Sequence, residues 1–237
     1  MPGLVCNIVG GVLSPLLANI FLHEVLDVWF ERDIKPRLKG RAVLIRYADD
    51  AVLGFSREED ARRVLAVLPK RFGKYGLSLH PEKTRLIDFR PPPGRGSREP
   101  SEPPRWRTFD LLGFTHYWAK SRRGYWVIKL KTATDRLTRA VTRISRWCRQ
   151  HRHLPTSEQH RELAQKLRGH YEYYGITGNA WMLDRFLRAV ERRWHYWLNR
   201  RSQHRDWTWE RFARFLRAKP LPPALAVHST WRHAANP

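Results

Sequence analysis

Two short apolar runs with only five residues between them constrain the fold of this chain more than any other feature. The runs are Ala42–Ile45 and Ala51–Phe55, each of strand length, and Arg46–Asp50 connects them. A connection this short leaves room only for a tight antiparallel hairpin. The sequence therefore predicts a β-hairpin whose turn carries two adjacent acids, Asp49 and Asp50.

Two adjacent carboxylates repel each other unless a cation or hydrogen-bond donors neutralise them. Carboxylate oxygens suit Mg²⁺, which proteins usually hold through one or two carboxylates together with substrate phosphates and water. Such an arrangement is half of the site that two-metal phosphoryl transfer requires. Aspartate is also a common turn residue, so the turn alone leaves a metal site and a solvated turn equally open.

Helical and strand patterns alternate around this hairpin. The pair Ser14–Pro15 predicts a helix that runs to about Phe30. Ser56 and Glu59 have the spacing of a capping box, which predicts a second helix. Four further runs are expected as strands of two hairpins: Leu77–Leu79 with Arg85–Phe89, and Phe109–Trp118 with Tyr125–Leu130. The Pro- and Gly-rich stretch 90–107 is expected to be a loop.

From Lys131 onward the apolar spacing is helical throughout. It predicts three long amphipathic helices and a short fourth at Thr208–Arg217, followed by a Pro-rich tail that we expect to be loose. The fold class is therefore α+β over residues 1–130, with an antiparallel sheet and packed helices. An all-α part follows over residues 131–237.

The charge balance points to a polyanionic partner. The chain has 45 basic and 22 acidic residues and a net charge of +23, which suits nucleic acid. The all-α part holds 22 of the basic but only 8 of the acidic residues, and 7 of the 11 tryptophans. It is therefore the stronger candidate for the main nucleic-acid surface.

The cysteine and apolar content excludes other classes of protein. Two cysteines, Cys6 and Cys148, are too few for a disulfide framework or a four-sulfur zinc site. The uncharged stretch Met1–His23 is densely apolar only over Leu16–Leu22, which is too short for a membrane helix. We expect a cytoplasmic protein without a membrane segment.

Tyr47–Asp50 reads Tyr-Ala-Asp-Asp and resembles the YADD box of reverse transcriptases. Four other segments, in the same order along the chain, resemble boxes of group II intron-encoded reverse transcriptase/maturases. These segments are Gly10–Leu22, Gly76–Thr84, Phe109–Phe114 and Leu167–Gly175. A four-letter box alone would be weak, whereas five ordered boxes across residues 10 to 175 are specific.

The resemblance implies a partial polymerase palm in residues 1–130 and a helical thumb/maturase-specific domain in residues 131–237. It implies RNA-directed DNA synthesis with two Mg²⁺ ions, binding of an RNA template and a DNA primer, and assistance to the splicing of intron RNA. Carried over by position, Asp49 and Asp50 would be the catalytic, metal-binding carboxylates.

The same resemblance implies residues that bind nucleotide or template. They are Tyr47 and Ala48 beside the incoming nucleotide, Gly10, Gly11 and Ser14 beneath the template base pair, Lys83 at a phosphate, and Gly113 at the primer. Three of them have structural alternatives, because helix caps, bulges and turns use the same residue types. Ser14 would then be a helix cap, Gly113 a bulge and Lys83 a turn lysine.

The chain departs from the family pattern at its start. The family has fingers, a first palm strand with a further aspartate, and a loop that reads Pro-Gln-Gly-Gly. Here Met1–Val9 holds no aspartate, and the loop reads Ile8-Val9-Gly10-Gly11. We expect an incomplete two-metal site and no polymerisation by this chain alone. The alternatives are a truncated enzyme with fingers supplied by a separate chain, an RNA-binding maturase-type module without polymerase activity, and a decayed gene fragment.

Basic and aromatic residues alternate in two segments of the all-α part. Such mixtures suit phosphates and unstacked bases of structured RNA. We expect contacts with group II intron RNA from Arg168, His170, Arg192, Arg193 and Tyr196. The alternative for the arginines is a solvated helix face. Trp194 and Trp197 share the apolar stripe of their helix and are expected in the core.

Overall fold

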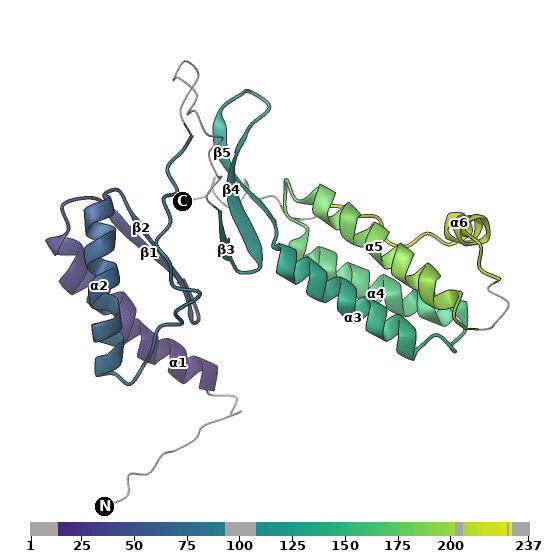
Figure 1. Ribbon diagram of the computed structural model, residues 1–237, viewed down its shortest axis with the longest axis horizontal. Coiled ribbons are helices and arrows are strands. Elements are labelled where there is room, and N and C mark those ends of the chain that lie inside the picture. Colours follow the sequence, from purple (N-terminus) through teal and green to yellow (C-terminus); the bar gives the residue numbers. More distant parts are fainter. Residues whose placement is uncertain (1–13, 93–107, 202–205, 227, 229–237) are drawn as a thin grey trace, which may run out of the picture. The chain divides into compact units, whose positions relative to one another are not determined.

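The computed structural model describes residues 14–92, 108–201, 206–226 and 228 (Figure 1). It divides into two compact units, Met1–Phe89 and Arg90–Pro237. The first unit contains the hairpin and the second contains a three-stranded sheet and the C-terminal helices. This division lies well before the boundary that the change of sequence pattern near residue 131 suggested.

The described part of the first unit begins with one long helical segment. Its parts are α1 (Ser14–Leu22), the π-helical η1 (His23–Val28) and η2 (Phe30–Ile34), and the short 3₁₀ turn η3 (Lys35–Arg37). The start agrees with the Ser14–Pro15 signal, but the segment continues past Phe30. Val25, Leu26 and Phe30 are buried, so burial of this apolar stripe continues through the π-helical turns.

The hairpin is formed as the spacing predicts. Strands β1 (Ala42–Tyr47) and β2 (Asp50–Phe55) are antiparallel, and Tyr47 pairs with Asp50 across the turn. Helix α2 (Glu58–Lys74) follows, with Leu68 and Phe72 on its buried side. These two side chains pack with Val25, Leu26 and Trp29 into the core of the first unit, and Leu44 of β1 lies against it.

Two expectations for the first unit are wrong. The capping box does not form: α2 has Arg57 as its N-cap residue without a side-chain bond, and the Ser56 hydroxyl accepts from the Arg41 amide (2.8 Å). Nor do strands form over residues 77–79 and 85–89. Leu77 and Leu79 pack on the core of the unit. The alternating apolar pattern is therefore explained by burial of these two side chains and not by a paired strand.

The second unit begins with a meander of three antiparallel strands, β3 (Phe109–Leu111), β4 (Phe114–Lys120) and β5 (Trp126–Thr132). The run 109–118, expected as one strand, is therefore two strands. It divides at Leu112 and Gly113, which both have positive φ, at 51° and 79°. Two consecutive residues with positive φ make the tight two-residue turn typical of hairpins.

The three long helices of the second unit lie side by side in Figure 1, and all four helices agree with the predicted pattern. They are α3 (Thr134–Gln150), α4 (Thr156–Tyr174), α5 (Ala180–Leu198) and the shorter α6 (Trp209–Ala218). Leu163, Leu183 and Trp194 are fully buried between them. Together with the sheets, these helices confirm an α+β fold.

Contacts within the second unit explain why its sheet groups with the helices. The Asn179 side chain, fully buried, accepts from the Thr132 amide of β5 (2.9 Å) and donates to the Thr132 hydroxyl (2.8 Å). Two residues after α6 also contact the rest of the unit. Leu221 is buried, and the His228 amide donates to the Gly175 carbonyl (2.8 Å). The expectation of a loose tail is wrong for these two positions.

Candidate active-site hairpin and basic helical surface

The turn between β1 and β2 presents both acids to solvent. Ala48 and Asp49 form the turn, and Asp50 is the first residue of β2. Asp49 and Asp50 are exposed, and 66% of Tyr47 is accessible. Ala48 has a φ of +52°, a left-handed conformation that is uncommon for a residue with a side chain.

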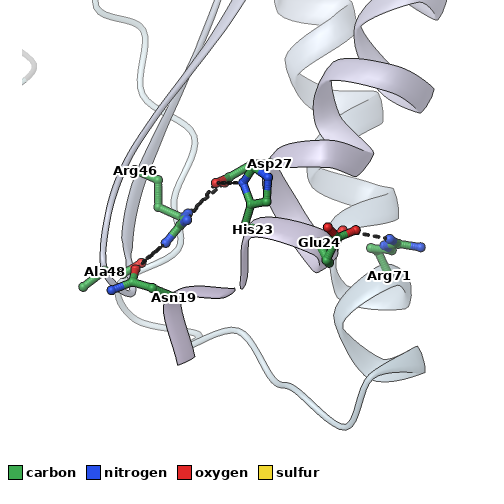
Figure 2. A network of polar contacts seen from close by, with 7 residues as sticks. All are labelled: Asn19, His23, Glu24, Asp27, Arg46, Ala48 and Arg71. Carbon is green, nitrogen blue, oxygen red and sulfur yellow. Dashed lines mark hydrogen bonds and ion pairs between the residues drawn. The ribbon is translucent and has the colours of Figure 1, made fainter. Parts of the chain in front are cut away.

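One arginine connects this turn to the preceding helical segment (Figure 2). The Arg46 guanidinium donates from Nη1 to the Ala48 carbonyl oxygen (2.8 Å) and to Asn19 Oδ1 (2.9 Å). Its Nε and Nη2 donate to the two carboxylate oxygens of Asp27, at 2.8 and 2.7 Å. The acid turn is thus tied to both α1 and η1.

The alternation of β1 places Arg46 on the side that makes these bonds. Leu44 and Arg46 are half-buried, whereas Val43, Ile45 and Tyr47 are exposed. Since side chains alternate between the two faces of a strand, the residue directly before Tyr47 is directed away from the solvent face. Only 12% of the Arg46 side chain remains accessible.

Ion pairing shifts the titration of both partners. The hydrogen bonds from Arg46 are the main cause that lowers the pKa of the Asp27 carboxyl, against the opposing effect of burial. Asp27 also lies 3.2 Å from His23 Nδ1. The pKa of Arg46 is raised, chiefly by the same hydrogen bonds. The pair is therefore ionised across the neutral range.

A second arginine, Arg71 of α2, forms hydrogen bonds with the main chain of η1. Arg71 donates to the main-chain carbonyls of Val25 (3.1 Å) and Glu24 (3.4 Å), as Figure 2 shows for Glu24. Its guanidinium also lies over the rings of Trp29 and Tyr75, 5.6 and 4.6 Å from their centroids. The segment that carries Asp27 is therefore held from two directions.

The donor set of the turn fits part of a magnesium site. Mg²⁺ is commonly bound through one or two carboxylates, with water and substrate phosphates completing its shell. Asp49 and Asp50 supply that number of carboxylates. Within the described residues no group of three or more His, Cys, Asp or Glu side chains could hold a metal. Any further acidic ligand would come from outside these residues or from another molecule.

The remaining residues expected at nucleotide or template come from separate segments of the chain. Gly10 and Gly11 lie outside the described residues. Ser14 is the first residue of α1, and Lys83 is exposed in a turn closed by its own amide on the His80 carbonyl (3.2 Å). Gly113 lies in the β3–β4 turn. A Cβ there would be 3.0 Å from the Tyr174 hydroxyl oxygen, so this glycine has a structural reason within the second unit.

Most residues expected to contact RNA lie on the surface of the helices. Arg168 of α4 and Arg192 and Arg193 of α5 are exposed. Tyr196 is 41% exposed, and the Arg200 guanidinium lies 4.2 Å from the centroid of its ring. The end of α5 and the turn after it therefore present an aromatic ring in contact with one arginine, Arg200, and two further exposed arginines, Arg192 and Arg193, lie within one turn of the helix before Tyr196.

His170 is placed differently from the other residues of this group. Its ring stacks on Phe186, with centroids 3.9 Å apart, and its Nε2 is buried without a hydrogen-bond partner. Burial lowers the pKa of His170 to about 4. Trp194 is fully buried and donates to Gln159 Oε1 (2.9 Å), as its place on the apolar stripe predicts. His170 is thus mostly part of the helical packing.

Sequence reasoning missed four residues of these sites: Arg46, Asp27, Asn19 and Arg200. The position of Arg46 was a usable signal, because it precedes the turn at an inward position of β1. Its partners lie 19 and 27 residues away along the chain, and no local pattern connects them to the turn.

The first unit combines packed helices with an antiparallel hairpin that carries two adjacent acids. Residues 7–116 match the sequence model of a family described as reverse transcriptase (RNA-dependent DNA polymerase). The matched stretch is similar to this domain family, and it includes the acid hairpin. No curated protein matches the chain.

Membrane insertion finds no support in the part of the chain that the structure describes. None of the helices there combines the length and the apolar character that a bilayer span requires.

Proposed function

We propose that this chain is a group II intron-encoded reverse transcriptase/maturase that binds intron RNA and contributes its acid hairpin to RNA-directed DNA synthesis. The observation that carries the proposal is the Asp49–Asp50 turn inside the matched reverse transcriptase domain. The group II assignment draws on the ordered boxes of the sequence, including Leu167–Gly175 in α4, which lies beyond the matched stretch.

In this proposal Asp49 and Asp50 hold Mg²⁺ at the end of a primer strand. Bound Mg²⁺ would activate the primer 3′-hydroxyl and stabilise charge on the leaving phosphate. In this proposal the Tyr47 ring, which is exposed one residue before the turn, would pack against an incoming nucleotide. A complete two-metal site needs more acids than these two, so a further segment or a second chain that brings the fingers would supply them.

Complementation of primer extension tests this function. The chain would be mixed with a separately produced fingers-and-first-palm segment, an RNA template, a DNA primer, deoxynucleotides and Mg²⁺. We expect extension only with both components, and none with Asp49→Asn. Glu59→Gln is the matched control, because Glu59 is an exposed acid on α2 away from the turn.

Two results would contradict the proposal. One is extension by the mixture that persists in Asp49→Asn. The other is failure of the chain to bind a template–primer duplex at all. Extension by the chain alone that disappears in Asp49→Asn would instead show that no partner for the fingers is needed.

The exposed arginines favour a second function, RNA binding without polymerisation. Among the described residues, no salt bridge involves Arg168, Arg192 or Arg193, although the charge of Arg192 acts on the adjacent Glu191. Exposed arginines and an exposed ring on the same helix suit RNA. Binding of intron RNA that is unchanged in Asp49→Ala but weakened at least tenfold in Arg168→Ala/Arg193→Ala would support this function. An Arg62→Ala variant provides the control for loss of an exposed charge on α2.

A further inference from the structure

The turn that bears the two acids contains one residue in an unfavourable backbone conformation. Ala48 has a φ of +52°, and hairpin turns that need positive φ at this position favour Gly, Asn or Asp. A side chain in the left-handed region is disfavoured by contact of its Cβ with the following carbonyl. Such a conformation persists only when surrounding contacts hold it.

Arg46 is the residue that makes those contacts. The Arg46 guanidinium donates four hydrogen bonds, and the Ala48 carbonyl oxygen in the turn accepts one of them. The other three end on Asn19 and Asp27 and fix the direction of the guanidinium. Arginine suits this place because its planar fork presents several donors in fixed directions, whereas lysine presents one compact ammonium group.

We propose that Arg46 is a positioning residue that holds the left-handed turn at Ala48 and thereby orients the Asp49 and Asp50 carboxylates toward a divalent cation. The part that concerns the cation rests on the proposed function, and the part that concerns the turn does not. In this role Asp27 and Asn19 act through Arg46, since they fix the guanidinium that bonds to the turn.

A purely stabilising ion pair would not require this geometry. The two bonds to Asp27 by themselves join η1 to β1. The bond from Nη1 to the Ala48 carbonyl spans only two residues of the hairpin, and it joins the turn to the guanidinium that Asp27 and Asn19 hold. Its effect is therefore on the conformation of the turn.

Amide hydrogen exchange in the full chain tests the first half of the proposal. The variants are Arg46→Gln, Arg46→Lys and Asp27→Asn, with Arg62→Gln as the control. Arg62 forms an exposed ion pair with Glu58 on α2 and its loss changes the net charge equally. We expect about tenfold faster exchange of the peptide spanning residues 46–52 in both Arg46 variants, a smaller increase in Asp27→Asn, and unchanged exchange in α2.

Mn²⁺ binding, followed by electron paramagnetic resonance, tests the second half. We expect Arg46→Gln to weaken Mn²⁺ binding about tenfold, the loss typical when a residue that orients a metal ligand is removed. Asp49→Asn should weaken it further, and Arg62→Gln should have no effect. If Arg46→Gln does not unfold cooperatively, Arg46→Lys decides, because it keeps the charge and loses the fork.

The outcomes separate the two hypotheses. If the Arg46 variants show the same amide exchange and the same Mn²⁺ affinity as the unaltered chain, the proposal is overturned. Faster exchange with unchanged, Asp49-dependent Mn²⁺ binding overturns the orienting half alone. Absence of any Asp49-dependent Mn²⁺ binding in the unaltered chain counts against the proposed metal site, while the exchange result still decides whether Arg46 holds the turn.

Discussion

The hairpin unit and the helical unit keep their functional residues in place by different means. Among the described residues, the core of the hairpin unit is a small cluster built from α2 and η1, with Trp29 and Phe72 as its largest members. The helical unit has a larger core that extends from Leu137 to Leu221 and encloses Trp194. Its exposed arginines stand on helices that this core already fixes.

The acids of the hairpin have no comparable support from apolar packing. Val43, Ile45 and Tyr47 of β1 are each more than half exposed, so one face of the hairpin has little packed against it in the first unit. The turn depends instead on the polar contacts of Arg46. The comparison teaches that a precise acid site can be held by directional hydrogen bonds where burial is scarce.

The largest effect expected is the loss of the central side chain of the helical unit. Trp194→Ala removes a fully buried ring and the partner of Gln159, so we expect the helical unit to lose about 3–5 kcal/mol of unfolding free energy. Denaturant unfolding followed by circular dichroism measures it. Trp181→Ala, at a site 49% exposed, should cost far less. Equal losses in the two variants would contradict the described core.

Acid should weaken the helical unit first, through His170. Its pKa is lowered by burial from 6.5 to about 4, so the unfolded chain binds a proton more readily than the folded one. The folded state should therefore lose about 2–3 kcal/mol as the pH falls from 6.5 toward 4. His170→Phe keeps an aromatic ring and should reduce this dependence, and the remainder is expected from His116, whose pKa is also lowered by burial. A variant that retains the same pH dependence would exclude His170 as its source.

The hairpin unit should respond to acid at lower pH, through Asp27. Its folded pKa lies below the ordinary 3.8, so its contribution is present above that pH and is lost as the pH falls through the lowered value. Asp27→Asn should cost about 1–2 kcal/mol at neutral pH and abolish the loss below pH 3.8. Hydrogen exchange of β1 and η1 measures it. Loss of protection in β1 already at pH 5 would contradict this assignment.

Local spacing predicted the parts of both units that depend on neighbouring residues. Five residues between two apolar runs were enough to predict the β1–β2 hairpin, and apolar periodicity predicted the long helices of the second unit. The expected surface position of Tyr196 and the burial of Trp194 are likewise confirmed, because both follow from which face of α5 is apolar.

Contacts between distant residues could not be predicted in the same way. Leu77 and Leu79 alternate as strand residues do, but their burial against the core needs no paired strand. The contacts of Arg46 with the turn depend on Asp27 and Asn19. The sequence positions of these two residues do not differ from those of surface polar residues on any helix. Buried Leu221 lies within the Pro-rich stretch 220–223, which has no periodicity, and only the packed structure shows that this residue joins the core.

The smallest effect expected distinguishes two explanations of Gly113. Alanine at Gly113 incurs the cost of positive φ and places a Cβ 3.0 Å from the Tyr174 hydroxyl oxygen. Gly124, in the other turn of the same sheet, has a φ of +83° and nothing near its would-be Cβ. We expect Gly124→Ala to cost about 1 kcal/mol from backbone strain alone, and Gly113→Ala slightly more. Thermal unfolding measures both. Gly113→Ala and Gly124→Ala could cost equal stability while only Gly113→Ala weakens primer–template binding. In that case close approach of the primer, and not the contact with Tyr174, explains why position 113 is a glycine.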